Sequence, residues 1–133
     1  MDAFTILYED AYLLAVNKPA GIAVEGEANA LEEQVKAWLQ QHTKYLDKIF
    51  VQSAHRIDKP VSGVVVLAKK RDALKRMMQL FRDKQVTKKY ITVVEGQPAN
   101  TAGTLEHYLI KNNALQKAVV GNPANGNLAR SEE

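Results

Sequence analysis

The sequence of 133 residues contains no cysteine and only three histidines. Without cysteine the chain forms no disulfide, no thiolate metal site and no cysteine nucleophile. The histidines, at positions 42, 55 and 107, are too far apart in the sequence to suggest a metal cluster. We therefore expect chemistry that uses no metal ion.

Long apolar runs are also missing. No stretch approaches the roughly 20 apolar residues that span a bilayer, so we expect no membrane segment. The N-terminus begins Met-Asp-Ala-Phe and continues with alternating apolar residues, unlike the basic and then apolar plan of a signal peptide. A chain of this length fits one domain. We expect a single domain over residues 1–133, located in the cytoplasm.

The net charge of +3 is small but unevenly distributed. Residues 55–90 contain eleven Lys or Arg residues against three Asp residues, which leaves a net charge of +8. The remaining seven basic and twelve acidic residues leave −5. A basic block of this kind attracts polyanions, although a solvated, lysine-rich helix face has the same composition.

The first third of the chain predicts a β-hairpin and a helix. Residues 4–8 and 12–16 are short aliphatic and aromatic runs on either side of a turn, the pattern of two paired strands. Residues 17–21, Asn-Lys-Pro-Ala-Gly, combine turn residues. From residue 31 apolar positions recur at helical spacing, which predicts an amphipathic helix with Trp38 in the core.

The middle of the chain predicts a buried strand and a second helix. Residues 64–68, Val-Val-Val-Leu-Ala, directly follow the polar stretch 55–63 and lack alternation, which predicts a strand buried on both faces. Residues 69–84 repeat apolar side chains at helical spacing opposite a basic face. This helix is expected to pack Met77 and Met78 into the core.

Three further strands are predicted in the last third. They cover residues 91–95, 104–110 and 115–120, with a turn at 111–114, and the chain after residue 121 reads as loop without a closing element. The fold class is therefore α+β, with a mainly antiparallel or mixed sheet and two flanking helices. It looks incomplete at its C-terminal end.

The stretch His-Arg-Ile-Asp-Lys-Pro-Val-Ser-Gly, residues 55–63, holds the strongest candidates for chemistry. Pro60 stiffens it, and Gly63 allows a sharp turn into the next strand. Arg56 lies two positions from Asp58, and a nearby cation keeps a carboxylate ionised, ready to act as a nucleophile or base. The alternative is a structural turn in which Asp58 caps backbone N–H groups and Arg56 pairs with surface acids.

The same stretch is similar to the HRLDxxTSG signature of the RluA-type pseudouridine synthases, which convert uridine to pseudouridine in ribosomal or transfer RNA. Residues 6–21 resemble the opening of that family, a strand pair followed by an NKPxG turn. Residues 88–96 resemble its second motif, a lysine-tyrosine pair that leads into a strand ending in glycine. Three matches in the right order are far more specific than one.

The resemblance implies a role for three residues. Asp58 matches the catalytic aspartate, and Arg56 matches the arginine that fills the space left by the flipped nucleotide and interacts with the aspartate. Tyr90 matches the tyrosine whose ring packs against the target base and assists proton removal. Whether Asp58 attacks C1′, attacks the base or removes a ribose proton stays open. Extruding the base costs a few kcal/mol, offset by stacking and backbone contacts.

Two departures from the family pattern matter. Val61 stands where threonine is usual, which removes a hydroxyl that would fix the loop. The third motif, a TGRxHQIR-like strand and turn, has no counterpart before Glu133. We therefore expect the N-terminal part of a catalytic domain. No S4-like RNA-binding domain is expected before it, because the first predicted strand begins at Phe4.

The leading hypothesis is an isomerase, a cofactor-free RNA pseudouridine synthase whose partner is structured RNA, either ribosomal or transfer RNA. An alternative is an RNA-binding fragment without catalysis, because the third motif is missing. A third possibility is a structural fragment that exposes an apolar sheet edge. The oligomeric state is left open by the sequence.

Overall fold

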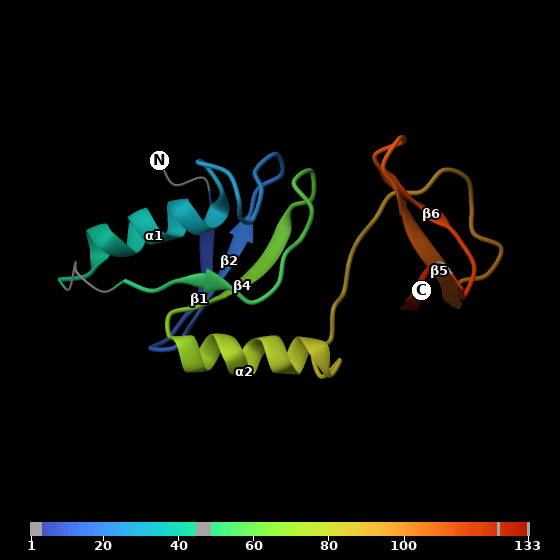
Figure 1. Cartoon of the computed structure of the whole chain (residues 1–133). Coiled ribbons are helices and arrows are strands. Elements are labelled where there is room, and N and C mark those ends of the chain that lie inside the picture. The colour runs from blue at the N-terminus through green and yellow to red at the C-terminus, as the bar shows by residue number, and fades with distance from the viewer. Residues whose placement is uncertain (1–3, 45–48, 125, 133) are drawn as a thin grey trace. The chain divides into compact units, whose positions relative to one another are not determined.

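The computed structural model of the chain describes residues 4–44, 49–124 and 126–132 (Figure 1). In these residues it contains two helices and seven strands. The chain forms two compact units, Met1–Lys89 and Tyr90–Glu133, and each is described by itself. The expectation of a single domain stays a prediction. No helix of the described residues is long and apolar enough to cross a membrane.

The first unit contains a four-stranded antiparallel sheet in the order β1-β2-β4-β3. The predicted hairpin is confirmed, since β1 pairs with β2, and the strand after the polar stretch is central, since β4 lies between β2 and β3. The bounds are β1 Thr5–Glu9, β2 Leu13–Lys18, β3 Gln52–Ser53 and β4 Gly63–Ala68.

Asp10 holds the turn of this hairpin. Its carboxylate accepts the backbone N–H groups of Tyr12 and Leu13, both at 2.7 Å. These two bonds, together with a bond from the Tyr8 hydroxyl, lower the pKa of Asp10 below its ordinary value of 3.8. A side-chain carboxylate that replaces backbone partners in this way is the usual reason for Asp in turns.

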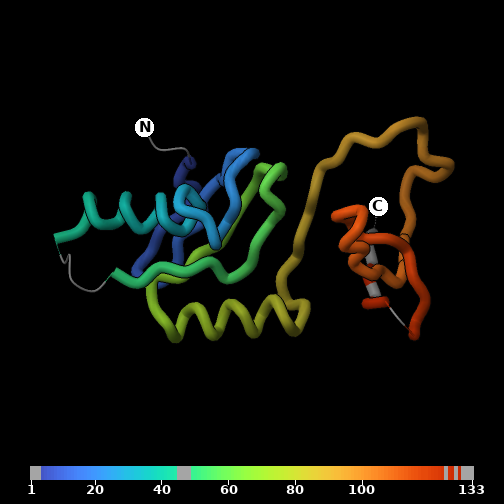
Figure 2. Tube along the Cα trace, turned by 45° about the horizontal axis from the view of Figure 1, so that its top comes forward, coloured from blue at the N-terminus to red at the C-terminus, as the bar shows by residue number. Residues whose placement is uncertain are grey.

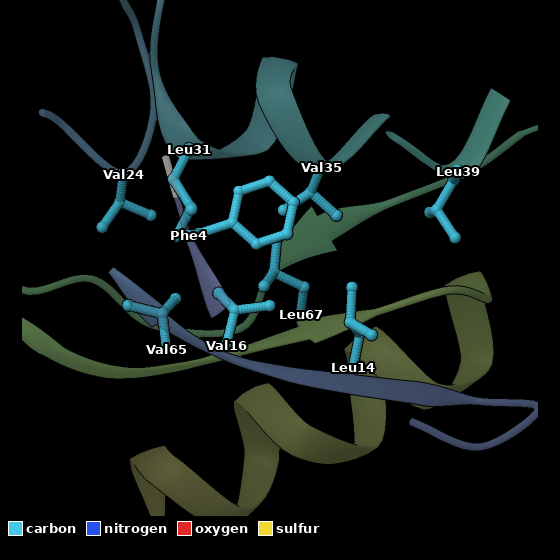
Figure 3. Close-up of a cluster of buried hydrophobic side chains, with 9 residues drawn as sticks. All are labelled: Phe4, Leu14, Val16, Val24, Leu31, Val35, Leu39, Val65 and Leu67. Carbon is cyan, nitrogen blue, oxygen red and sulfur yellow. The ribbon is translucent and has the colours of Figure 1, made fainter. Parts of the chain in front are cut away.

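The core of the first unit lies between the sheet and α1, Leu31–His42 (Figure 3). Strand alternation turns every second residue of β2 and β4 toward the helix, and helical spacing turns every fourth residue of α1 toward the strands. Trp38 packs partly buried against this core, as predicted. The buried apolar residues are Phe4, Leu14, Val16, Val24, Leu31, Val35, Leu39, Val65 and Leu67.

The opposite face of the sheet carries α2, Arg71–Arg82, and is less well covered (Figure 3). Val64 of β4 lies on this face and is 55% exposed, whereas Val66 is half-buried and Ala68 is buried. The prediction of a strand buried on both faces is therefore wrong at the Val64 end of β4. The prediction that Met77 and Met78 are core residues was also wrong. No residue of α2 is buried, and Met78 is exposed. Helix α2 packs against β4 but leaves Val64 uncovered.

The second unit is a three-stranded antiparallel sheet in the order β6-β5-β7. Strand β5 spans Thr104–Asn112, β6 spans Lys117–Val120 and β7 spans Asn127–Glu132. The turn between β5 and β6 lies at residues 113–116, two residues later than predicted, and Gln116 adopts a φ of 53° there. Strand β7 corrects the prediction that the chain ends in loop, because its backbone pairs with β5 over its whole length.

The predicted strand at residues 91–95 is not formed. Ile91 and Val93 are fully exposed, and none of the described strands pairs with this segment. A β-branched run favours extended backbone, but a strand also needs a neighbour for its N–H and C=O groups. The sequence pattern was therefore wrong about strand pairing in this segment.

We expect Leu67→Ala to lower the free energy of unfolding of the first unit by about 2–5 kcal/mol, because it leaves a cavity in a fully buried position. Denaturant unfolding followed by the fluorescence of Trp38, the single tryptophan, reports on this unit. Leu7→Ala is the matched control, since Leu7 is exposed. It should change the free energy by less than about 0.5 kcal/mol. Equal losses would contradict the described core.

Candidate functional site

The candidate site lies where β2 ends and β4 begins. Lys18, the last residue of β2, is paired with Gly63, the first residue of β4. The first loop, residues 19–30, follows β2, and the second loop, residues 54–62, precedes β4 and contains Asp58. Both loops therefore leave the sheet at the same end. Figure 2 shows the two loops side by side. Every site residue predicted in the first unit belongs to the second of these loops.

Lys18 ties the two loops together from inside the protein. Its side chain is fully buried, with 0% exposed. Its ammonium donates hydrogen bonds to the carbonyl oxygens of Pro19 at 2.9 Å, Ile22 at 2.7 Å and Lys59 at 3.2 Å. Burial lowers the pKa of Lys18 below 10.5, whereas the three carbonyl acceptors favour the charged form. A buried ammonium is tolerated when its donors are satisfied in this way.

The sequence-based prediction missed Lys18 as a structural residue, although a signal was present. Lys18 follows Leu14 and Val16 at strand spacing, so period-2 alternation places it on their buried face. A lysine on a buried face needs acceptors, and the turn that follows supplies them. The acceptors are the carbonyl groups of Pro19 in the turn, of Ile22 just after it and of Lys59 in the other loop.

Backbone geometry completes the connection between the loops. The N–H of Gly21 donates to the carbonyl of Lys59 at 2.8 Å, and Gly21 has a φ of 95°. Within the second loop the N–H of Val61 donates to the carbonyl of Asp58 at 3.0 Å, which closes a four-residue turn. Gly63 leaves this turn with a φ of 146°, a conformation that strongly favours glycine.

The side chain of Asp58 is exposed at this turn. In residues 4–44, 49–124 and 126–132, no hydrogen-bond donor or cation pairs with its carboxylate. The first part of the structural alternative, in which the Asp58 carboxylate caps the turn, is therefore not the arrangement found, because the backbone carbonyl of Asp58 closes the turn instead. The loop backbone is fixed while the carboxylate faces solvent.

Two glutamates of the first loop bind the two cations that flank Asp58. The Arg56 guanidinium lies 3.3 Å from a carboxylate oxygen of Glu25, and the Lys59 ammonium lies 3.0 Å from both oxygens of Glu27. Arg56 is thus paired with a surface acid, as the second part of the structural alternative predicts. Its expected interaction with Asp58 stays a prediction.

His55 anchors the start of the loop to β4 and α2. Its Nε2 accepts the N–H of Val66 at 3.1 Å, and its ring stacks on Phe81 with 4.5 Å between ring centroids. Because an amide N–H donates to Nε2, that nitrogen carries no proton. Burial, and to a smaller extent the charge of Lys88, lowers the pKa of His55 below 6.5. His55 therefore acts as a neutral structural residue beside the candidate site.

Tyr90, the third predicted site residue, is exposed and belongs to the second unit. The structure brings Arg56 and Asp58 together in one loop, whereas the role of Tyr90 beside Asp58 stays a prediction. The described residues contain no cluster of three His, Asp or Glu side chains that would hold a metal ion.

The basic block of the sequence divides into paired and unpaired cations. Arg56 and Lys59 bind glutamates of the first loop, and Lys69 lies 2.8 Å from Glu9. On α2, Lys75 and Arg76 are exposed and have no ion-pair partner among the residues that the structure describes. The unneutralised positive charge therefore includes the outer surface of α2.

Comparison with known proteins decides the family. The family model described as RNA pseudouridylate synthase matches residues 12–132, which is nearly the whole chain. The chain belongs to the RNA pseudouridylate synthase family. The resemblance inferred from the Asp58 loop and its two companion motifs is thereby confirmed. The matched region includes both loops of the candidate site.

Curated relatives in this family include proteins named ribosomal large subunit pseudouridine synthase C. The one from Buchnera aphidicola (subsp. Schizaphis graminum) is 46% identical over 91 residues, which is 68% of this chain and 28% of that protein. The one from Vibrio vulnificus is 37% identical over 109 residues, covering 80% of this chain and 33% of that protein. The chain spans about a third of the length of these relatives.

Solved structures of pseudouridylate synthases confirm the predicted fold class. Human RNA Pseudouridylate Synthase Domain Containing 4 superposes with a TM-score of 0.78 at 26% identity, over 96% of this chain and 52% of that one. Human RNA Pseudouridylate Synthase Domain Containing 1 has the same fold, with a TM-score of 0.76 at 18% identity, over 98% of this chain and 50% of that one. The chain spans about half the length of these structures.

We expect Lys18→Met to lower the free energy of unfolding of the first unit by about 2 kcal/mol, because three carbonyl oxygens lose a charged donor. Trp38 fluorescence during denaturant unfolding measures this change. Lys36→Met makes the same substitution at an exposed position of α1 and should change stability by less than about 0.5 kcal/mol. If the two variants are equally stable, Lys18 does not hold the loops.

His55 predicts a pH dependence of stability. Because the pKa of His55 in the folded protein lies below 6.5, the unfolded chain binds more protons once the pH falls past 6.5. The free energy of unfolding is therefore highest above 6.5 and falls as the pH drops through that value. Unfolding followed by Trp38 fluorescence between about pH 5 and pH 8 measures the slope.

His55→Gln should flatten this slope, because glutamine does not titrate but still offers an oxygen to the N–H of Val66. His107→Gln is the control, since His107 lies in the second unit and should leave the slope unchanged. A slope that survives in His55→Gln would show that another group causes it.

Proposed function

We propose that this protein isomerises uridine to pseudouridine in RNA and that Asp58 is its catalytic residue. The observation that carries the proposal is the exposed carboxylate of Asp58, which has no partner among the described residues and lies on a backbone held by Lys18 and Gly21, in a member of the RNA pseudouridylate synthase family. A carboxylate without a protein partner is available to a ligand, and a fixed backbone holds it in a defined direction.

The reaction requires few participants. The bond between N1 and C1′ breaks, the uracil turns, a bond forms between C5 and C1′, C5 loses its proton and N1 ends with one. Atoms and electrons balance without a co-reactant, so we propose no cofactor and no metal ion. Asp58 fits three roles, namely attack on C1′, attack on the base and removal of a ribose proton. Each role needs an ionised carboxylate that is close to the nucleoside.

We further propose that Arg56 and Tyr90 contact the RNA. Arg56 is 76% exposed next to Asp58, and its planar guanidinium suits phosphate. Tyr90 is exposed, and an aromatic ring supplies a surface on which a base stacks. The unpaired cations on α2 supply a track for the RNA backbone.

Ribosomal RNA of the large subunit is the substrate that we propose first, because relatives at 37% and 46% identity are named ribosomal large subunit pseudouridine synthase C. Transfer RNA is the second candidate. A structured RNA of either kind is a cytoplasmic partner, and the cytoplasm is the location that we propose.

A second candidate function is RNA binding without catalysis. The chain spans about half of the length of the solved pseudouridylate synthases. In this case the loops and the basic surface bind RNA, and no uridine is isomerised. Both functions require RNA binding, but only pseudouridine formation requires the Asp58 carboxylate.

We expect Asp58→Asn to reduce pseudouridine formation to background, because the amide keeps the size of the side chain and removes its charge. The assay measures tritium released from [5-³H]uridine-labelled large-subunit ribosomal RNA, which reports loss of the C5 proton. Glu33→Gln on α1 is the control and should leave the rate unchanged, because Glu33 is exposed and has no ion-pair partner among the described residues. Stability should stay within about 0.5 kcal/mol of the parent, because the Asp58 carboxylate has no partner among the described residues.

Retained tritium release in Asp58→Asn would refute the catalytic role of Asp58. If the parent releases no tritium but binds the RNA, and Asp58→Asn binds equally well, the second function is correct. Binding through the basic surface should weaken with salt, with a slope near −0.7 per phosphate contacted on a single strand. Salt-insensitive binding would contradict the proposed RNA track.

A further inference from the structure

The two ion pairs between the loops of the candidate site differ in how firmly they hold. Lys59 is anchored at both ends. Its ammonium lies 3.0 Å from both oxygens of Glu27, and its carbonyl accepts bonds from Gly21 and Lys18. Arg56 is attached to Glu25 by a single contact of 3.3 Å. The Lys59–Glu27 pair therefore helps to hold the two loops together, whereas the Arg56–Glu25 pair is easily broken.

The Arg56–Glu25 pair is also the more exposed of the two. The side chain of Arg56 is 76% exposed, and that of Glu25 is 45% exposed. Exposed pairs of this kind contribute little, because water and salt screen them and both side chains lose freedom. The guanidinium sits on a flexible stem of three methylene groups, so it can leave Glu25 without any movement of the anchored backbone.

We propose that Glu25 is a positioning residue that holds the Arg56 guanidinium in the RNA-free protein and gives it up to a phosphate of the bound RNA. The inference rests on the proposed function and adds a competitor for Arg56 on the first loop, which is hydrogen-bonded to the Asp58 loop. While Glu25 occupies the guanidinium, Arg56 neither neutralises Asp58 nor binds RNA. An RNA phosphate that approaches the loop replaces Glu25 and brings Arg56 into the complex.

Charge and geometry favour this exchange. A guanidinium binds phosphate through two parallel N–H groups, whereas Glu25 accepts only one bond. The displaced Glu25 returns to full hydration at low cost, because it is already exposed. Glu27 stays with Lys59, so the loop that bears Asp58 keeps its position while Arg56 changes partner. The Arg56–Glu25 ion pair therefore weakens RNA binding, because it must break before Arg56 can bind a phosphate.

The test is a double-mutant cycle on RNA binding by the whole chain. The probe is a fluorescein-labelled stem-loop transcript of large-subunit ribosomal RNA, and fluorescence anisotropy at fixed salt measures its Kd. Glu25→Gln should tighten binding about two- to fivefold, the scale of an exposed ion pair. In an Arg56→Ala background the same substitution should change Kd by less than about 1.5-fold, because the two effects are coupled through one contact.

Glu33→Gln is the charge control. Glu33 is exposed on α1 and has no ion-pair partner among the residues described. It removes the same charge without touching Arg56, and we expect a change of less than about 1.5-fold in Kd. A purely structural role for Glu25 would weaken binding, and a general charge effect would persist in the Arg56→Ala background. Either result overturns the proposal.

The outcomes separate this inference from the proposed function. If the protein binds RNA and releases tritium in an Asp58-dependent manner, but Glu25→Gln is not coupled to Arg56, the positioning role is wrong and the function stands. If neither binding nor tritium release is found, the proposed function fails and the inference fails with it.

Discussion

One buried charge organises the candidate site. The Lys18 ammonium lies inside the protein and donates hydrogen bonds to carbonyl groups of both loops, so it stabilises the arrangement in which the first loop and the Asp58 loop lie together. Breaking the contact leaves a buried ammonium and unpaired carbonyl groups, which is costly. The precision of the Asp58 backbone therefore depends on a residue that takes no part in the chemistry.

Around this fixed frame the side chains are arranged in two classes. Neutral or anchored groups, such as His55 against Phe81 and Lys59 on Glu27, connect the loop to the rest of the first unit. Exposed groups, Asp58 and Arg56, are free to exchange water or weak partners for a ligand. This division suits a family whose members act on RNA, because the backbone is set in advance while the contacting side chains remain adaptable.

The local patterns of the sequence predicted the helices and the hairpin of the first unit well. They failed where burial or strand pairing depends on residues that are distant in the sequence. Helical spacing identified α1, and alternation identified the β1–β2 hairpin. Val64 and Met78 were assigned to the core because they are apolar, yet burial depends on what covers a face. Residues 91–95 and strand β7 differ from the prediction for the same reason, since strand pairing is not a property of one segment.

The sequence by itself determined the motif residues, their order and the family, because the identity and spacing of side chains are properties of the linear chain. Only the tertiary structure decided that Lys18 is buried, that Glu25 rather than Asp58 binds Arg56, and that His55 is neutral. Each of these depends on groups that are remote in the sequence and meet when the sheet forms. Charge partners are set by distance in space, which no local pattern contains.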